Sequence, residues 1–142
     1  MKRTHDEFYL KDNNLFVKDS FVEIANRIVP DFEGSIIDVG CATGAFPRFL
    51  KSRFPKAKIY GAEYLQSLRE KATQSFPDIE FIYGNVLDRH SVKKQFDIVT
   101  LAGVLCIFDD YHSVLANTLS WVKPGGKLIL HNKISEYDFD IF

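Results

Sequence analysis

The sequence predicts an α/β fold with a doubly wound, mainly parallel sheet, and three observations support that prediction. Short apolar runs alternate with amphipathic segments along most of the 142 residues. The run from Phe96 to Ala102 is largely apolar, which is typical of a parallel strand covered on both faces. A loop that contains Gly40 and Gly44 connects another apolar run to an amphipathic segment, in the order strand, loop, helix.

The first elements follow from capping and periodicity. Ser20 and Glu23 have the spacing of a capping box, which predicts a helix that ends by Val29-Pro30. Its expected buried stripe is Phe21, Ile24, Ala25 and Ile28. The apolar run that starts at Ser35 predicts the first strand, with Asp38 near its end. The expected apolar face of the next helix is Phe46, Phe49 and Leu50.

The later elements alternate in the same way. The sequence predicts strands over 58–63, 79–83, 96–102 and 127–131, a helix over 65–75 and a polar connection over 88–95. Asp109 or Asp110 is expected to cap one more helix, and Lys123-Pro124-Gly125-Gly126 is expected to end it. The expected apolar side of that helix is Val114, Leu115, Leu119 and Val122. Strands that alternate with helices imply right-handed crossovers and a parallel sheet.

An acidic residue, Glu63, ends the second predicted strand. In nucleotide-binding α/β folds a carboxylate at this point accepts hydrogen bonds from a ribose diol. The loop spacing excludes two phosphate-binding motifs, the dinucleotide fingerprint and the Walker loop. Ala42 and Ala45 occupy the second and third glycine positions of a dinucleotide fingerprint, and no lysine follows Gly44 as in a Walker loop. The order strand, loop, helix, strand and acid therefore predicts a cofactor site of another type.

The segment Asp38-Val39-Gly40-Cys41-Ala42-Thr43-Gly44 resembles the first motif, hDhGxGxG, of class I S-adenosylmethionine (SAM)-dependent methyltransferases. The resemblance covers roughly residues 20–132 and continues, in family order, through Tyr60–Leu65, Phe81–Asp88, Phe96–Leu105 and Leu119–Leu130. It implies a Rossmann-like sheet of order 3-2-1-4-5, SAM as the cofactor, and methyl transfer to an unidentified acceptor. The Asn-Pro-Pro-Tyr type motif of DNA and protein amide methylases is absent from residues 102–105, which argues against a nucleobase exocyclic amine as the acceptor. The expected acceptor is a small molecule.

The resemblance also implies a set of cofactor-binding residues: Asp38, Gly40, Cys41, Ala42, Gly44, Glu63, Tyr64, Asn85, Val86, Ala102 and Gly103. In that pattern Asp38 holds the loop and the amino group of the methionine part, and the backbone of residues 40–44 cradles the methionine and ribose. Glu63 binds the ribose hydroxyls, and Tyr64 packs on the adenine. The remaining residues read the adenine edge at 85–86 and line the methyl side at 102–103.

Two of these residues depart from the family pattern. Ala42 replaces the middle glycine, and Asn85 stands where an aspartate often contacts the adenine amino group. An amide oxygen can accept the same hydrogen bond. Alternative roles remain open, with Glu63 as a solvated strand end and Asn85 as a turn residue after Gly84. The joint order of the motifs favours the cofactor site.

The sequence predicts no particular catalytic residue. The sulfonium of SAM already makes its methyl group electrophilic, so the protein contributes mainly proximity and orientation. Asp109, Asp110 and His112 follow the fourth predicted strand, where a substrate lies in this fold. A helix cap at Asp110 and an exposed His112 is the favoured alternative.

The composition is that of an ordinary soluble domain. Its 18 basic and 19 acidic side chains give a net charge of −1, which provides no electrostatic signal for nucleic acid or membrane. No signal peptide is readable, and no apolar run approaches the roughly 20 residues of a membrane helix. Cys41 and Cys106 have neither metal nor redox spacing, so we expect no metal site and a cytoplasmic location. Cys41 is interpreted as a small apolar filler rather than a nucleophile.

We expect one domain, in which residues 1–34 form an N-terminal lid or helix segment packed on a SAM-binding core over residues 35–142. Strands six and seven of the family are expected to be missing. Tyr137, Phe139 and Ile141 alternate with aspartates, a pattern that predicts a short tail strand. That strand is expected to cover the open edge of strand five or to pair with a second copy. The alternative to an active methyltransferase is a SAM-binding or methyltransferase-like module without catalysis, completed by a partner or second subunit.

Overall fold

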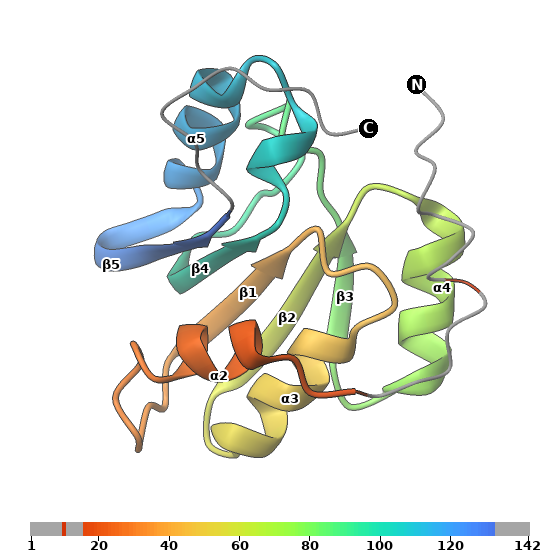
Figure 1. The fold of residues 1–142 in the computed structure, drawn as a ribbon, viewed down its shortest axis with the longest axis vertical. Coiled ribbons are helices and arrows are strands. Elements are labelled where there is room, and N and C mark those ends of the chain that lie inside the picture. Colours follow the sequence, from red (N-terminus) through yellow and green to blue (C-terminus); the bar gives the residue numbers. More distant parts are fainter. Residues whose placement is uncertain (1–9, 11–15, 133–142) are drawn as a thin grey trace.

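The computed structural model describes residue 10 and residues 16–132 of the chain (Figure 1). The elements, in chain order, are α2 (Asp19–Ala25), β1 (Ser35–Val39), α3 (Ala45–Arg53), β2 (Lys58–Glu63), α4 (Gln66–Ser75), β3 (Glu80–Tyr83), β4 (Phe96–Ala102), the 3₁₀ turn η1 (Leu105–Ile107), α5 (Tyr111–Leu119) and β5 (Val122–His131). Within this described part of the chain, every helix is too short or too polar to span a bilayer.

The strands form one sheet of order β3-β2-β1-β4-β5 in which all neighbours pair in parallel. This confirms the predicted fold class and strand order. Parallel strands end at the same edge of a sheet, so the carboxyl ends of β1, β2 and β4 lie close together (Figure 1). The register places Asp38 opposite Thr100, and it places Val39 opposite Ala62, the residue before Glu63. The predicted site segments therefore meet at one edge.

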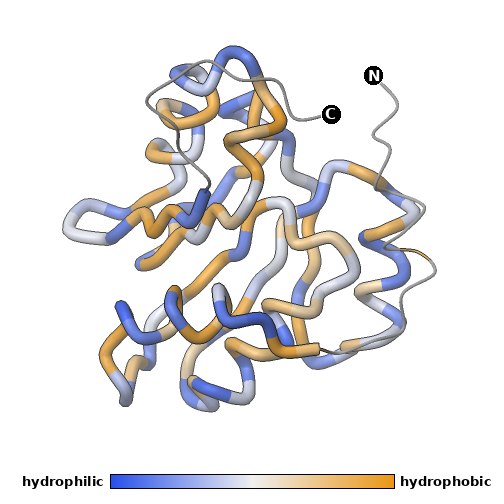
Figure 2. Tube along the Cα trace, viewed as in Figure 1, coloured by the Kyte–Doolittle hydropathy of each residue, from blue (hydrophilic) through white to orange (hydrophobic). Residues whose placement is uncertain are grey.

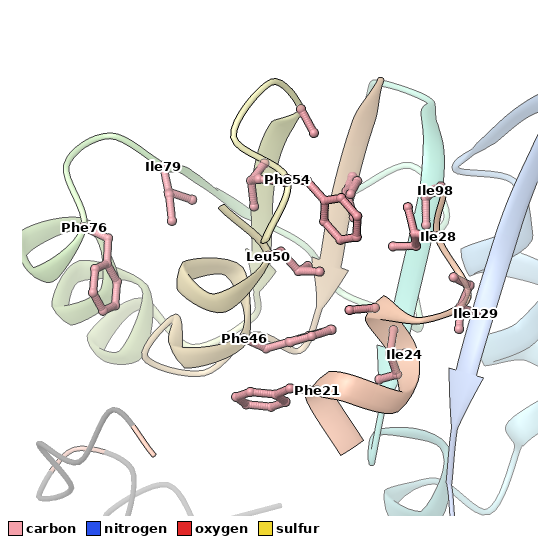
Figure 3. Packing of buried hydrophobic residues seen from close by; sticks show 14 residues of the cluster. Phe21, Ile24, Ile28, Phe46, Leu50, Phe54, Phe76, Ile79, Ile98 and Ile129 are labelled. Atoms are coloured by element: carbon pink, nitrogen blue, oxygen red, sulfur yellow. The ribbon is translucent and has the colours of Figure 1, made fainter. Parts of the chain in front are cut away.

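Hydrophobic residues follow the central strands (Figure 2), and the buried ones form two cores. Ile36 belongs to one core and Ile37 to the other, as the alternation of side chains along a strand requires. The first core packs under α2 and α3, where the rings of Phe21 and Phe46 stack with centroids 4.7 Å apart (Figure 3). The second core includes Val114 of α5. Both faces of the sheet are thus covered.

The predicted bounds of β2 and β4 are confirmed, whereas two helix boundaries are wrong. No capping box forms at Ser20, because α2 begins directly after Lys18 and no side chain caps it. The last helix, α5, ends at Leu119, and β5 begins at Val122 rather than at Lys127. Leu119 is consequently 54% exposed and does not belong to the buried stripe that the sequence predicts.

A bulge explains how β5 includes residues that usually break a strand. Phe96 pairs with Val122 and Ile98 pairs with Lys127, so residues 123–126 bulge out of the ladder with β4. Gly125 takes a φ of 78° there, and in the described part of the chain β5 has a neighbour on one side only, where proline is tolerated. The predicted tail strand and part of the predicted N-terminal lid, residues 1–9 and 11–15, lie outside the described residues. The division at residue 34 stays a prediction.

Candidate functional site

The loop from Gly40 to Gly44 connects β1 to α3 at the edge where the strands end. The N–H groups of Gly40 and Cys41 both donate to the carbonyl of Ala62, at 2.8 and 3.1 Å. The Gly44 N–H donates to the carbonyl of Cys41 at 2.9 Å, and Gly44 is the N-cap of α3. The loop is therefore tied to β2, and α3 begins beside the ends of the strands.

Packing within the protein explains both glycines of this loop. A Cβ at Gly40 would lie 2.6 Å from Cγ2 of Val104, and a Cβ at Gly44 would lie 2.8 Å from Cζ of Phe81. Their φ angles are 76° and 89°, a conformation that glycine adopts without strain. Close approach of the protein's own side chains is therefore one reason for glycine at both positions.

Asp38 lies near the end of β1 and is 4% exposed. Its Oδ1 accepts a 2.8 Å hydrogen bond from the hydroxyl of Thr100 on β4. Burial raises the pKa of Asp38 to about 7; the Thr100 hydrogen bond opposes the rise and the charge of Glu63 adds to it. The loop N–H of Ala42 donates to Glu63, and the expected role of Asp38 in holding the loop stays a prediction.

Glu63 connects two backbone segments at the end of β2. Its Oε2 accepts from the N–H of Ala42 and its Oε1 from the N–H of Leu65, both at 2.9 Å. The side chain is 4% exposed, so the alternative of a solvated strand end is wrong. Ala42 has a φ of 50°, a left-handed conformation that costs a non-glycine residue roughly 1 to 2 kcal/mol. The hydrogen bond from Ala42 to Glu63 offsets part of that strain.

A small cavity lies between the loop and the start of α2. Its lining residues are Lys18, Phe21, Asp38, Gly40, Cys41, Ala42, Thr43, Ala45, Phe46 and Ala102. Lys18 is missing from the set predicted from sequence, because it precedes β1 by a whole helix and belongs to no motif. The fold brings its positive charge to the same cavity as Asp38.

An aromatic pair lies beside Glu63 at the ends of β2 and β3. The ring centroids of Tyr64 and Tyr83 are 6.1 Å apart, and both side chains are nearly half exposed. The guanidinium of Arg69 lies 5.7 Å from the Tyr83 ring centroid, and its Nη1 donates to the carbonyl of Glu63 at 2.9 Å. Tyr83 and Arg69 are also missing from the predicted set, since their proximity depends on strand pairing and on the start of α4.

The segment after β3 is held in place by α5. Asn85 accepts a 3.0 Å hydrogen bond from the N–H of Leu87 through Oδ1, which is the turn role that the sequence left open. The carbonyl of Val86 accepts from Nδ2 of Asn117 on α5 at 2.8 Å. Among the described residues, the Val86 N–H has no hydrogen-bond partner. This segment therefore presents an unused backbone donor at Val86, and the amide oxygen of Asn85 keeps one acceptor position.

The end of β4 leaves open space. Ala102 is half-buried and lines the cavity. Gly103 has a φ of 68°, with no atom within 4 Å of where a Cβ would lie. Its N–H donates to the carbonyl of His131 at 2.8 Å, which fixes the backbone at this point.

The acid–base candidates after β4 do not form a catalytic pair. The Ser113 hydroxyl donates to Oδ2 of Asp110 at 2.5 Å and the Ser113 N–H donates to Oδ1 at 3.1 Å, so Asp110 caps α5 and these two bonds lower its pKa. Asp109 and His112 are both exposed, and the His112 ring lies against Tyr111. The capping alternative is therefore confirmed for Asp110.

Cys41 is buried, and burial, followed by the charges of Asp38 and Glu63, raises its thiol pKa well above the ordinary value. A thiol that resists ionisation is a poor nucleophile, which supports its interpretation as a filler. Cys106 is exposed. The described residues contain no cluster of histidine, cysteine and carboxylate side chains that could hold a metal ion.

The contact between Gly40 and Val104 predicts a difference between two glycine-to-alanine variants. Gly40→Ala is expected to lower the free energy of unfolding by about 2 to 5 kcal/mol, because it combines left-handed strain with overpacking of Val104. Gly125→Ala has nearly the same φ but open space around its Cβ, so it should cost only roughly 1 to 2 kcal/mol. Urea denaturation measures both, and equal losses would contradict the packing argument.

Comparisons with known proteins agree on one family. A family described as "Methyltransferase domain" matches residues 36–126, from β1 into β5. The malonyl-[acyl-carrier protein] O-methyltransferase of Halalkalibacterium halodurans is 27% identical to this chain over 90% of it and 54% of that protein. The demethylmenaquinone methyltransferase of Deinococcus radiodurans is 33% identical over 67% of this chain and 41% of that protein. The chain thus spans about half, or less, of these curated relatives.

A solved structure is similar over nearly the whole chain. It is the SAM-bound amino pentose methyltransferase from Micromonospora echinaspora, with a TM-score of 0.74 and 22% sequence identity. The similarity covers 99% of this chain and 60% of that one. At this level of identity the likeness concerns the fold, and it agrees with the sheet order described above.

Proposed function

This chain belongs to the methyltransferase domain family, and on that premise we propose that it binds SAM and transfers the methyl group to a small-molecule acceptor. The observation that carries the proposal is the cavity beside residues 40–44, with the buried carboxylates of Asp38 and Glu63 at the ends of adjacent parallel strands. Open α/β sheets bind ligands at this edge, next to the point where the strand order reverses.

The residues present fit SAM in charge and in hydrogen-bond capacity. Asp38 offers a carboxylate to the ammonium group of the methionine part. Each carboxylate oxygen of Glu63 keeps an acceptor position for a ribose hydroxyl. The Val86 N–H, which has no partner among the described residues, is a donor for an adenine nitrogen. Tyr64 offers an exposed ring to the adenine face.

SAM, when bound, supplies a methyl group that its positive sulfur makes electrophilic. The chain's own residues bind SAM and orient it. Asp38 and the backbone of residues 40–44 hold one end of the ligand, and Glu63 holds its centre. Ala102 and Gly103 leave room on the β4 side for an acceptor to approach in line. We assign no side chain as a general base.

The proposed acceptor is a small molecule or a small group carried by a larger one. The names of two similar proteins specify acceptors of this kind, a malonyl group on an acyl-carrier protein and demethylmenaquinone. The net charge of −1 gives no support for a nucleic-acid acceptor. Ile107 and Tyr111 are exposed beyond the end of β4 and offer an apolar surface to such a molecule.

Calorimetry with the purified chain tests the cofactor. SAM and S-adenosylhomocysteine are expected to bind. NADP is not, because the buried acid Glu63 favours a free ribose diol over a 2′-phosphate. NAD is not, because Ala42 and Ala45 occupy glycine positions of the dinucleotide fingerprint. Incubation with radiolabelled SAM and pooled metabolites then tests transfer, and a labelled product is expected. Tight binding of NADP without a signal for SAM would refute the proposal.

The second candidate function is a SAM-binding module without catalysis, completed by a partner or by a second copy. The observation that favours it is the edge of β5, which has no neighbour on one side in the described part of the chain, with Leu130 44% exposed. An unpaired edge invites another strand. Binding of SAM without any labelled product in the same experiment would favour this candidate, and sedimentation would then identify self-association.

A further inference from the structure

The cavity beside the glycine loop combines an acidic and a basic side chain from different elements. Asp38 comes from β1, and Lys18 immediately precedes α2; these are the charged residues among those that line the cavity. The other lining residues are apolar or small, including Phe21 and Phe46. A ligand group that matches such a cavity carries a positive and a negative charge a short distance apart, as an α-amino acid does.

Lys18 has no carboxylate partner among the described residues. The ion pairs in that part of the chain join Lys56 to Glu33, Lys94 to Glu80 and Lys123 to Asp97. The ammonium of Lys18 lies 5.9 Å from the ring centroid of Phe21. Its charge is therefore available to an anion that enters the cavity.

The start of α3 adds hydrogen-bond donors to the same cavity. Ala45 and Phe46, the first two residues of this nine-residue helix, both line the cavity. Gly44 provides no side-chain cap, and the first turn contains no acidic residue. The free N–H groups and the positive end of the helix dipole therefore favour a negative group beside Lys18.

Aromatic packing fixes the position of Lys18 relative to α3. Phe21, one turn after Lys18, stacks on Phe46 with ring centroids 4.7 Å apart and planes at 28°. The two rings lie side by side in Figure 3. The Phe21 N–H also donates to the Lys18 carbonyl at 2.9 Å. Lys18 thus enters the cavity from a segment that is anchored on the helix it faces.

We propose that Lys18 binds the carboxylate of the ligand's amino acid moiety, so that the cavity selects an intact α-amino acid end. This assignment rests on the proposed function, and it adds a specificity residue outside the sequence motifs. Asp38 binds the ammonium group, while Lys18 and the N–H groups of Ala45 and Phe46 bind the carboxylate. A nucleoside that lacks the amino acid moiety gains nothing from Lys18.

The test compares two ligands and three variants by calorimetry. S-adenosylhomocysteine has the amino acid moiety, and 5′-methylthioadenosine lacks it. Lys18→Met keeps the aliphatic stem beside Phe21 but removes the charge. It is expected to weaken S-adenosylhomocysteine binding by about tenfold or more and to leave methylthioadenosine binding unchanged. Lys18→Arg should retain most of the affinity, and Lys56→Met, away from the cavity, should bind both ligands as the unmodified chain does.

The outcomes separate this assignment from the proposed function. Unchanged S-adenosylhomocysteine affinity in Lys18→Met would overturn the assignment. So would an equal loss for both ligands, because it would mean that Lys18 supports the position of α2 and not the carboxylate. If the unmodified chain bound neither nucleoside, the proposed function would fail, and the assignment with it.

Discussion

Replacing Glu63 with alanine is expected to lower both the stability of the ligand-free domain and its affinity for SAM. The carboxylate accepts the N–H groups of Ala42 and Leu65, and it is 4% exposed. Hydrogen bonds to charged groups contribute about 1.5 to 3 kcal/mol each. Their loss leaves two half-buried donors without their partner and removes the restraint on Ala42, so the free energy of unfolding should fall by about 3 kcal/mol.

The affinity for SAM should fall further, because the same carboxylate is proposed to accept the ribose hydroxyls. Losing that interaction directly is expected to cost about 1 to 3 kcal/mol, and a displaced loop adds to the loss. Urea denaturation without ligand measures the first effect, and calorimetry with SAM measures the second. The two measurements distinguish the structural role of Glu63 from its role toward the ligand.

Glu33→Ala is the matched control for this experiment. Glu33 forms an exposed ion pair with Lys56 at 3.1 Å, with both side chains about two-thirds exposed. Exposed pairs contribute roughly 0 to 1 kcal/mol, so this variant should unfold and bind almost as the unmodified chain does. If Glu63→Ala kept its stability and lost only affinity, the two backbone hydrogen bonds would be energetically unimportant. If it kept both, Glu63 would have no role at the site.

The parts of the fold that sequence predicts well are those that local pattern determines. β2 and β4 have the bounds predicted from their apolar runs, because buried strands need such runs whatever surrounds them. The start of β5 could not be predicted in the same way. Lys123-Pro124-Gly125-Gly126 has the composition of a turn, and only pairing with β4 turns it into a bulged edge strand. The capping box was wrong because α2 begins at Asp19 with Lys18 as its N-cap, so Ser20 lies inside the first turn.

The same distinction between local pattern and tertiary contact applies to the residues of the candidate site. Asp38, Glu63 and the glycine loop belong to contiguous motifs and could be selected from the sequence. Thr100 could not, because its contact with Asp38 depends on the register between β1 and β4. Lys18 could not, because its place in the cavity depends on how α2 packs on α3. Site residues whose position depends on tertiary contacts can therefore be identified only from the structure.

Asp38→Asn is expected to change how the stability of the ligand-free domain depends on pH. Burial raises the pKa of Asp38 from 3.8 to about 7 in the folded chain. Between these values the unfolded chain has released the proton while the folded chain still holds it. The unmodified domain therefore loses stability as the pH rises through this window. Each pKa unit corresponds to about 1.4 kcal/mol, so the full effect approaches about 4 kcal/mol.

Asparagine cannot ionise, and its amide oxygen can still accept from Thr100, so the variant isolates the titration. The free energy of unfolding of Asp38→Asn, minus that of the unmodified chain, should increase from pH 4 to pH 7 and then level off. Chemical denaturation at a series of pH values measures this difference. A difference that stays constant over that range would show that Asp38 is already ionised in the folded domain.

Asp97→Asn provides a control of opposite sign. Hydrogen bonds from the N–H and hydroxyl of Ser35, and the ammonium of Lys123, lower the pKa of Asp97. That carboxylate stabilises the fold above its unfolded pKa, and the contribution disappears as the pH falls through the folded value. As the pH falls, the difference in free energy of unfolding between the unmodified chain and Asp97→Asn should therefore decrease. An ammonium group beside Asp38 favours the ionised form of this carboxyl. Binding of S-adenosylhomocysteine at pH 6 should therefore release a proton from the unmodified chain and none from Asp38→Asn. Calorimetry in two buffers of different ionisation enthalpy measures the number of protons released.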